Sequence, residues 1–169
     1  LQSHALARRL RHVGAKCAVI GVSGGLDSSL ALLVAARAAD ICGMPRSAIE
    51  AVSMPGFGTS GKTYDNSLAL SKSVGASVRT IPVNALVSQH FKDISHDPAV
   101  KNVTYENAQA RARTYILMNL ANELGGIVVG TGDLSELALG WCTYNGDHMS
   151  MYGVNSGVPK TLVKHLAKY

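Results

Sequence analysis

Cysteine is scarce in this sequence. Three cysteines occur among 169 residues, at positions 17, 42 and 142. Their number is odd, their spacing is wide and no Cys-x-x-Cys pair is present, so neither a disulfide framework nor a zinc or iron–sulfur site is indicated. We therefore expect the chain to work in a reducing, cytoplasmic environment.

Long apolar runs are also missing. No stretch approaches the ~20 apolar residues that a membrane helix needs, and the first residues show no signal-peptide pattern. The first residue is Leu1 rather than Met, so we expect a piece cut from a longer chain. No membrane partner is expected.

Runs of basic residues are absent, although the chain as a whole is basic. Lys and Arg number 16 against 11 Asp and Glu, which gives a net charge of +5. These residues are scattered, and no run of them marks a nucleic-acid track. The positive charge favours a polyanionic ligand, and ATP would satisfy it as well as RNA; without a basic run we expect no nucleic-acid partner.

Apolar residues and glycine, in contrast, are abundant. Hydrophobic residues make up 47% of the chain, and 17 glycines are spread along it. This balance argues against disorder and suits a buried sheet. The length fits one domain, which we place at residues 1–169.

Short apolar runs alternate with helical patterns along the chain. Strands alternating with helices predict an α/β fold, a doubly wound parallel sheet with helices on both faces. An amphipathic helix comes first, in which Leu6, Leu10 and Val13 recur at helical spacing among three arginines. The predicted strands are residues 17–22, 48–53, 76–83 and 126–130, and the predicted helices are residues 26–39, 64–74, 85–92, 105–124 and 160–168.

The sequence Ser-Gly-Gly-Leu-Asp-Ser at residues 23–28 points to a phosphate site. It leaves the carboxyl end of strand 17–22 and opens the next helix, so free backbone N–H groups and a positive helix N-terminus converge there. Glycine is needed because a side chain would block the approach of phosphate oxygens, while serine hydroxyls add donors. The residues expected to bind phosphate are Gly21, Ser23, Gly24, Gly25, Ser28 and Ser29.

Asp27 in this loop needs a separate explanation. A carboxylate repels pyrophosphate unless a cation lies between them, and Mg²⁺ prefers hard oxygen ligands together with phosphate oxygens. We therefore expect Asp27 to bind Mg²⁺. The alternative is a glycine-rich turn in which Asp27 and Ser28 only cap a helix. A Walker loop and a Gly-x-Gly-x-x-Gly dinucleotide fingerprint are both absent.

The loop after a first strand resembles the signature of the ATP pyrophosphatase superfamily, which implies an adenine nucleotide alpha hydrolase-like, Rossmann-like fold. Residues 107–113, 130–140 and 144–147 are similar to NAD synthetases, especially the synthetase portion of the glutamine-dependent bacterial enzymes. The resemblance runs over nearly the whole chain. It implies ATP-dependent amidation of deamido-NAD to NAD through an adenylated intermediate, with release of AMP and pyrophosphate.

The resemblance also implies roles for single residues. Glu136 would join Asp27 at the metal, and Thr131 would contact ATP. Asp147 and Lys160 would contact deamido-NAD and phosphate groups. Lys160 would also screen the negative charge that builds during adenylation. Asp27, Glu136 and Lys160 are thus the expected catalytic residues. The structural alternatives are favourable charge near a helix N-terminus for Glu136, a surface position for Lys160 and a turn for Thr131.

Asn107 and Arg111 are four residues apart and share one helix face. The resemblance implies that this face lies toward the nicotinate half of deamido-NAD and toward a partner subunit, so we expect a homo-oligomer. Arg113 is expected to point elsewhere.

The family pattern extends further than this chain in both directions. It continues past residue 169, and the glutamine-dependent enzymes have an upstream glutaminase domain that supplies ammonia from glutamine. We expect this chain to lack both. Two rival functions stay open: a tRNA-modifying member of the superfamily, which would explain the basic charge, and a nucleotide-binding module without catalysis, which would have no use for Glu136 or Lys160.

Overall fold

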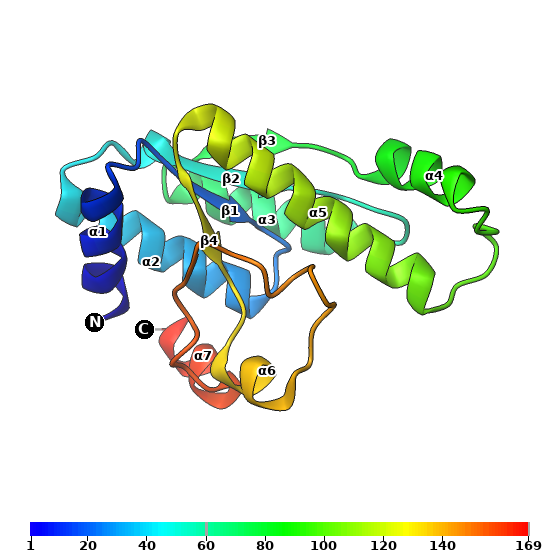
Figure 1. Cartoon of the computed structure of the whole chain (residues 1–169). Coiled ribbons are helices and arrows are strands. Elements are labelled where there is room, and N and C mark those ends of the chain that lie inside the picture. The colour runs from blue at the N-terminus through cyan, green and yellow to red at the C-terminus, as the bar shows by residue number, and fades with distance from the viewer. Residues whose placement is uncertain (60, 169) are drawn as a thin grey trace.

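The computed structural model describes residues 1–59 and 61–168, and its centre is a parallel sheet (Figure 1). In the described residues, five strands lie in the order β3-β2-β1-β4-β5, and every pairing between neighbours is parallel. This confirms the predicted doubly wound sheet. The strands are β1 (Ala18–Gly21), β2 (Ile49–Ser53), β3 (Ser77–Thr80), β4 (Ile127–Gly130) and β5 (Tyr152–Gly153).

Helices cover both faces of the sheet, as predicted (Figure 1). One face packs against α1 (Gln2–Val13), α2 (Leu26–Cys42), α3 (Gly61–Ser73) and α7 (Lys160–Leu166). The other face packs against α4 (Asn84–Asp93) and α5 (Val103–Leu124). Ala18 and Ile20 of β1 enter the first core, and Val19 enters the second. A strand buried on both sides must be apolar at every position, which explains the continuous apolar run.

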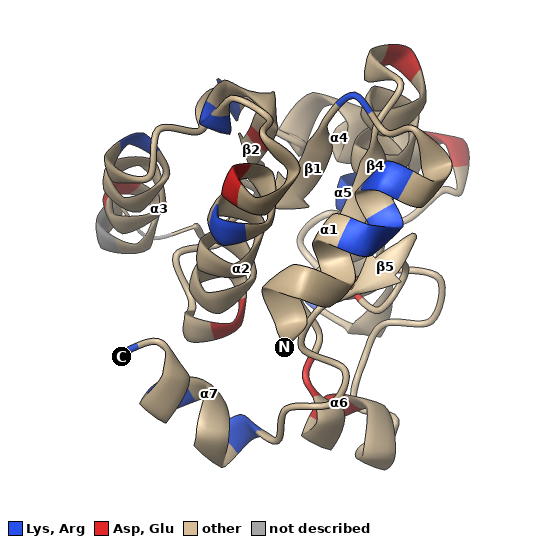
Figure 2. Ribbon diagram, turned by 90° about the vertical axis from the view of Figure 1, so that its left-hand side faces the viewer, with Lys and Arg blue, Asp and Glu red and all other residues tan. Residues whose placement is uncertain are grey.

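The predicted basic face of the first helix is confirmed, but the predicted apolar stripe is shorter than expected. Leu6 and Leu10 of α1 are buried, while Arg8, Arg9 and Arg11 are exposed. Val13, the third residue of the predicted stripe, is exposed as well, because it lies at the end of the helix. Figure 2 shows the Lys and Arg positions along α1 in blue. The helix ends at Gly14, whose φ of 62° is the left-handed conformation that glycine adopts without strain.

The region after β4 contains elements that the sequence pattern did not predict. Residues 134–139 form the helix α6 (Leu134–Leu139), and β5 extends the sheet by one strand of two residues. Such a short strand carries no period for a pattern to detect. The predicted strand 76–83 is also too long. It ends at Thr80, although the N–H groups of Ile81 and Val83 still donate to Ser53 and Pro55; Pro82 between them has no backbone N–H for a sheet.

The described helices include none that combines the length and the apolar character needed to cross a membrane.

Sheet order decides where a ligand site can lie. The chain leaves β1 through α2 toward β2 on one side, whereas β4 pairs with β1 on the other side. Open α/β sheets bind ligands at such a switch point, outside the carboxyl ends of the strands. The loops after β1 and β4, at residues 22–25 and 131–133, meet at this point.

Candidate functional site

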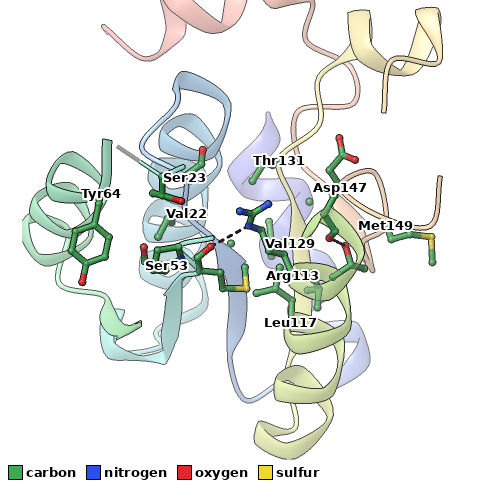
Figure 3. Close-up of a pocket in the computed structure, with 18 residues that line it drawn as sticks. Val22, Ser23, Ser53, Tyr64, Arg113, Leu117, Val129, Thr131, Asp147 and Met149 are labelled. Carbon is green, nitrogen blue, oxygen red and sulfur yellow. Dashed lines mark hydrogen bonds between the residues drawn. The ribbon is translucent and has the colours of Figure 1, made fainter. Parts of the chain in front are cut away.

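A cavity of about 430 Å³ opens at the switch point (Figure 3). Its walls come from the carboxyl ends of β1, β2 and β4 and from one side of α5. Gly21, Ser23, Thr131 and Asp147, four of the residues predicted from sequence, line it. The volume lies in the range of pockets that hold small ligands.

The glycine-rich loop forms a tight turn before α2. Gly24 has a φ of 80°, and a Cβ atom there would lie 2.2 Å from the backbone oxygen of Thr63. Only glycine fits this position. The first turn of α2 follows directly, and the N–H groups of a helix's first turn have no partners within the helix. The loop therefore presents backbone donors at one end of the cavity.

The serines of the loop bond mainly within the loop. The hydroxyls of Ser28 and Ser29 donate to the backbone oxygen of Gly25, over 3.0 Å and 2.8 Å. The backbone N–H of Ser23 donates to Ser28 Oγ over 3.3 Å, and Ser28 is buried. Ser23 Oγ also bonds within the loop, since it accepts from the N–H of Gly25 at 3.2 Å and lies 3.2 Å from Ser28 Oγ. Ser23 is nevertheless exposed and lines the cavity. All three serines therefore shape the loop, and Ser23 also borders the cavity.

Three carboxylates gather beside this loop. One oxygen atom from each of Asp27, Asp133 and Glu136 lies within 4.8 Å of the other two. The predicted pair of Asp27 and Glu136 is thus brought together, although 109 positions separate the two residues in the sequence. Asp133 was not predicted. Its signal was present in the sequence as a capping box, an Asp followed three residues later by Glu.

Asp133 begins α6. Its Oδ1 accepts a hydrogen bond from the backbone N–H of Glu136 at 2.9 Å, and Glu136 Oε2 accepts one from the N–H of Asp133 at 3.3 Å. The Asp133 side chain is 0% exposed. Burial acts to raise the pKa of Asp133, but the Glu136 N–H and the Lys160 ammonium outweigh it and hold the pKa below its ordinary value.

Lys160 contacts all three carboxylates. Its Nζ lies 2.6 Å from Asp27 Oδ2, 3.1 Å from Asp133 Oδ2 and 3.2 Å from Glu136 Oε1. The hydrogen bond to Asp27 is the largest cause that raises the pKa of Lys160 above its ordinary value. Figure 2 shows the acidic start of α2, the acidic α6 and the lysine at the start of α7 in one region of the molecule.

The donor set fits a hard divalent cation. All the candidate ligand atoms are carboxylate oxygens, which Mg²⁺ prefers. Among the described residues, Asp27 Oδ1 is a buried oxygen without a hydrogen-bond partner, whereas the buried Asp133 Oδ2 has the Lys160 ammonium as its partner at 3.1 Å. Buried carboxylate oxygens are normally hydrogen-bonded or bound to a cation. Asp27 Oδ1 is therefore available as a ligand, and Asp133 Oδ2 already faces a cation.

Asn155 joins the two loops of the site. Its side chain is 0% exposed. The amide Nδ2 donates to the backbone oxygens of Asp27 and Thr131, at 3.0 Å and 3.1 Å. Gln2 of α1 donates in turn to Asn155 Oδ1 over 3.0 Å. No pattern in the sequence marked Asn155, because its role depends on two backbone atoms that are distant in the chain.

The shared helix face of Asn107 and Arg111 is present, and it holds the segment that follows α6. Asn107 Oδ1 accepts a hydrogen bond from Thr143 Oγ1 at 2.9 Å, and Arg111 Nε donates to the backbone oxygen of Tyr144 at 2.9 Å. Asp147 accepts from the N–H of Thr143 at 2.7 Å and lines the cavity. The two α5 residues thus place the Asp147 segment at the cavity.

Arg113 was expected to point elsewhere than Asn107 and Arg111, and its partner is indeed a different segment. Its Nε donates to the backbone oxygen of Met54 at 3.1 Å, and the residue lines the cavity. In Figure 3 its guanidinium points into the space between Ser23 and Thr131. Burial lowers the pKa of Arg113, and nearby Glu106 partly opposes this shift. No sequence pattern placed Arg113 at the cavity, because that placement depends on which side of α5 faces the carboxyl ends of the strands.

The fold, the glycine-rich loop and the carboxylate cluster together define a nucleotide-binding α/β domain. Residues 2–169 match the model of the NAD synthase family. The chain belongs to this family, which confirms the resemblance found in the sequence.

Relatives of known name are closely similar to this chain. The glutamine-dependent NAD(+) synthetases of Mycobacterium leprae and Mycobacterium tuberculosis H37Rv are 49% and 48% identical to it over 174 residues, covering 100% of this chain and 26% of each relative. The chain therefore spans about a quarter of their length.

Solved structures share the same architecture. The glutamine-dependent NAD+ synthetase from Acinetobacter baumannii, solved with adenosine diphosphate, superposes with a TM-score of 0.91 at 31% identity over 99% of this chain and 31% of that one. The NMN synthetase from Francisella tularensis superposes with a TM-score of 0.88 at 25% identity, over 99% of this chain and 67% of that one.

Proposed function

We propose that this chain is the ATP-using part of an enzyme that amidates deamido-NAD to NAD. The observation that carries the proposal is the meeting of the glycine-rich loop with the three carboxylates of Asp27, Asp133 and Glu136 at one switch point. Family membership and the glutamine-dependent NAD(+) synthetases among its relatives give the reaction class.

The reaction has two steps. A carboxylate oxygen of deamido-NAD attacks the α-phosphorus of ATP, a new P–O bond forms, and pyrophosphate leaves with the electron pair of the broken α–β bridging bond. Ammonia then attacks the acyl carbon of the adenylate, AMP leaves, and the nitrogen gives up a proton. Neither step needs a nucleophile from the protein, so the protein acts by positioning and charge.

The ATP phosphates would lie against the loop at residues 21–29, with Thr131 on the opposite strand end. The backbone N–H groups of the loop and the start of α2 favour negative charge. Arg113 adds a fixed cation inside the cavity. ATP is thus held as a co-substrate, with its α-phosphorus directed into the cavity.

The Mg²⁺ expected from the sequence fits this site. Asp27, Asp133 and Glu136 would hold it, because their oxygens are close together and Asp27 Oδ1 is buried without a hydrogen-bond partner. Bound there, Mg²⁺ would neutralise charge on the departing pyrophosphate.

Deamido-NAD would occupy the side of the cavity next to Asp147. Asn107 and Arg111 would act on the substrate through the segment they hold, since their side chains are hydrogen-bonded to Thr143 and Tyr144. Lys160 remains the residue proposed to reach phosphate groups during adenylation.

The wider setting is also a proposal. The ammonia would come from glutamine through a separate domain, as the names of the relatives indicate. The assembly would be a homo-oligomer, and the enzyme would work in the cytoplasm. The present chain would be one domain of that larger protein.

A product analysis tests the function. The full-length protein is mixed with ATP, Mg²⁺, deamido-NAD and ammonia, and products are separated by chromatography. We expect NAD, AMP and pyrophosphate in equal amounts, and Asp27→Asn should abolish them. ADP with phosphate, or ATP cleavage that does not depend on deamido-NAD, would contradict the proposal.

A second acceptor belongs in the same assay, because the Francisella NMN synthetase has the same fold. Nicotinate mononucleotide is therefore supplied in place of deamido-NAD. Preference for deamido-NAD supports the proposed substrate. Preference for the mononucleotide assigns the chain to the NMN-forming reaction instead.

A further inference from the structure

The ammonium of Lys160 lies where a cation bound to the three carboxylates would lie. Its contacts with Asp27, Asp133 and Glu136 span 2.6–3.2 Å. Mg²⁺ binds oxygen at about 2.1 Å. Oxygens within 4.8 Å of one another leave a single central position. An ammonium and a metal ion therefore cannot both take it.

Lys160 does not fully satisfy the carboxylates. Three negative charges face one positive charge. Asp27 Oδ1 also stays buried without a hydrogen-bond partner in the described residues. A cluster with residual negative charge and an unpaired oxygen favours replacement of the ammonium by a divalent cation.

The lysine side chain is free to leave. It is 52% exposed, in contrast to the fully buried Asp133. The backbone of Lys160 is anchored separately, since its N–H donates to Ser135 Oγ at 3.1 Å. The flexible four-carbon stem can therefore move while the start of α7 stays in place. Asp27 lies in the first turn after the glycine-rich loop, so a displaced ammonium remains next to the phosphate site.

We propose that Lys160 is a resident counter-ion of the carboxylate cluster, and that binding of a divalent cation displaces its ammonium toward the phosphate loop. The lysine then serves two states of one site: it neutralises the carboxylates before the cation binds, and it contacts phosphate afterwards. This inference rests on the proposed metal role of the cluster and adds competition between lysine and metal.

Competition makes a counterintuitive prediction about affinity. Removing the lysine should strengthen cation binding, even if it abolishes the reaction. Mn²⁺ is titrated into the protein without nucleotide and followed by electron paramagnetic resonance. Lys160→Met should bind Mn²⁺ about tenfold more tightly than the natural protein, because one unit of competing positive charge is gone. Lys160→Gln repeats the test with a polar side chain.

Lys164 provides the matched control. It lies one turn further along α7 and is exposed. Lys164→Met removes the same charge from the same helix, outside the cluster, and should leave Mn²⁺ affinity unchanged. Circular dichroism at the titration temperature verifies that each variant is folded.

The outcomes separate this inference from the proposed function. Unchanged or weaker Mn²⁺ binding in both Lys160 variants overturns the competition, even if the natural protein makes NAD. Equal tightening in the Lys164 variant reduces the effect to net charge and also overturns it. Absence of Mn²⁺ binding in the natural protein and in every variant also overturns the competition. If the natural protein forms no NAD but the Lys160 variants bind Mn²⁺ more tightly, the proposed function is contradicted and the competition between lysine and metal is supported.

Discussion

Asp133 uses its two carboxylate oxygens for different purposes. Oδ1 caps α6, while Oδ2 faces the Lys160 ammonium at 3.1 Å. One residue thus fixes the start of a helix and contributes charge to the cluster. The capping role holds the charged oxygen in a defined direction, because the side chain is anchored at its other end.

Two substitutions at Asp133 separate its capping role from its charge. Asparagine can still cap a helix but carries no charge, whereas alanine does neither. We expect Asp133→Asn and Asp133→Ala to lower Mn²⁺ affinity alike. The alanine variant should lose about 1 kcal/mol more of the free energy of unfolding. Urea denaturation together with Mn²⁺ titration checks this, and equal stability of the variants would argue against the cap.

Gly24 is required both for its left-handed backbone conformation and for the close approach of the Thr63 carbonyl, and the two effects can be measured separately. Gly24→Ala should lower the free energy of unfolding by about 3 kcal/mol, because the left-handed backbone disfavours alanine and the methyl group meets the Thr63 carbonyl. ATP affinity should fall as the loop moves. Thermal unfolding and ATP titration measure the two effects.

Gly43 is the control for backbone conformation alone. Its φ is 68°, and a Cβ atom there would meet no atom within 4 Å. Gly43→Ala should therefore cost about 1 kcal/mol and leave ATP binding unchanged. If both variants lose the same stability, close approach at Gly24 has no role.

At the scale of elements, the site depends on contacts between loops that leave different strands. Asn155 links the start of α2 to the loop after β4 through two backbone carbonyls. Gln2 of α1 donates a hydrogen bond to Asn155 Oδ1, which connects these two loops to α1. The arrangement keeps Asp27 and Thr131 at a fixed separation across the switch point, so Asn155 is a positioning residue.

Asn155→Asp tests this link with almost no change in shape. A carboxylate cannot donate to the carbonyls of Asp27 and Thr131, so the variant should lose roughly 3 kcal/mol of unfolding free energy. ATP affinity should also fall, measured where the variant is fully folded. Ser156→Ala, next in sequence, removes only an exposed hydrogen bond to the backbone oxygen of Gly153 and should change stability by no more than about 1 kcal/mol. Normal ATP affinity in Asn155→Asp would reject the positioning role.

At the scale of the whole molecule, the three cysteines report on how tightly the chain is packed. Cys17 is buried between β1 and α5, Cys42 is half-buried and Cys142 is exposed. Burial raises the pKa of the Cys17 thiol, and nearby Glu50 adds to the shift. A raised pKa leaves less of the reactive thiolate.

A thiol-specific reagent at pH 8 should therefore modify Cys142 first and Cys17 last. We expect Cys17 to react only when the molecule opens, so its rate should rise steeply with added urea. Intact-mass measurements over time follow the sequence of additions, and peptide mapping identifies each site. Early reaction at Cys17 would mean that the core between β1 and α5 opens readily.

Much of the fold was predictable because it depends on local pattern. The strand 17–22, the glycine-rich loop and the following helix were placed correctly, since buried strands require continuous apolar residues and the loop requires glycine. The helix α6 and the strand β5 were not predicted, because both are short and lie among turn residues. Their formation depends on neighbours: β4 for β5, and the Asp133 cap for α6.

Part of the site was also predictable from local sequence pattern. Asp27 and Glu136 were identified from residue type and resemblance, and the structure brings their oxygens together. Asp133 and Arg113 were missed because nothing in local sequence shows which side of a helix or loop faces a distant strand end. Roles in binding and catalysis for the predicted residues stay predictions until the assays above are done.

The amino-acid sequence by itself determined the α/β class, the phosphate loop and the family resemblance, because these depend on the period of apolar residues and on glycine at fixed spacing. Only the tertiary structure decided that Lys160 pairs with Asp27, 133 positions away, and that Asn155 links two loops. The physical reason is the sheet order, which places β1 beside β4. No local sequence pattern specifies which strands become neighbours, and the charges of the site meet only after they do.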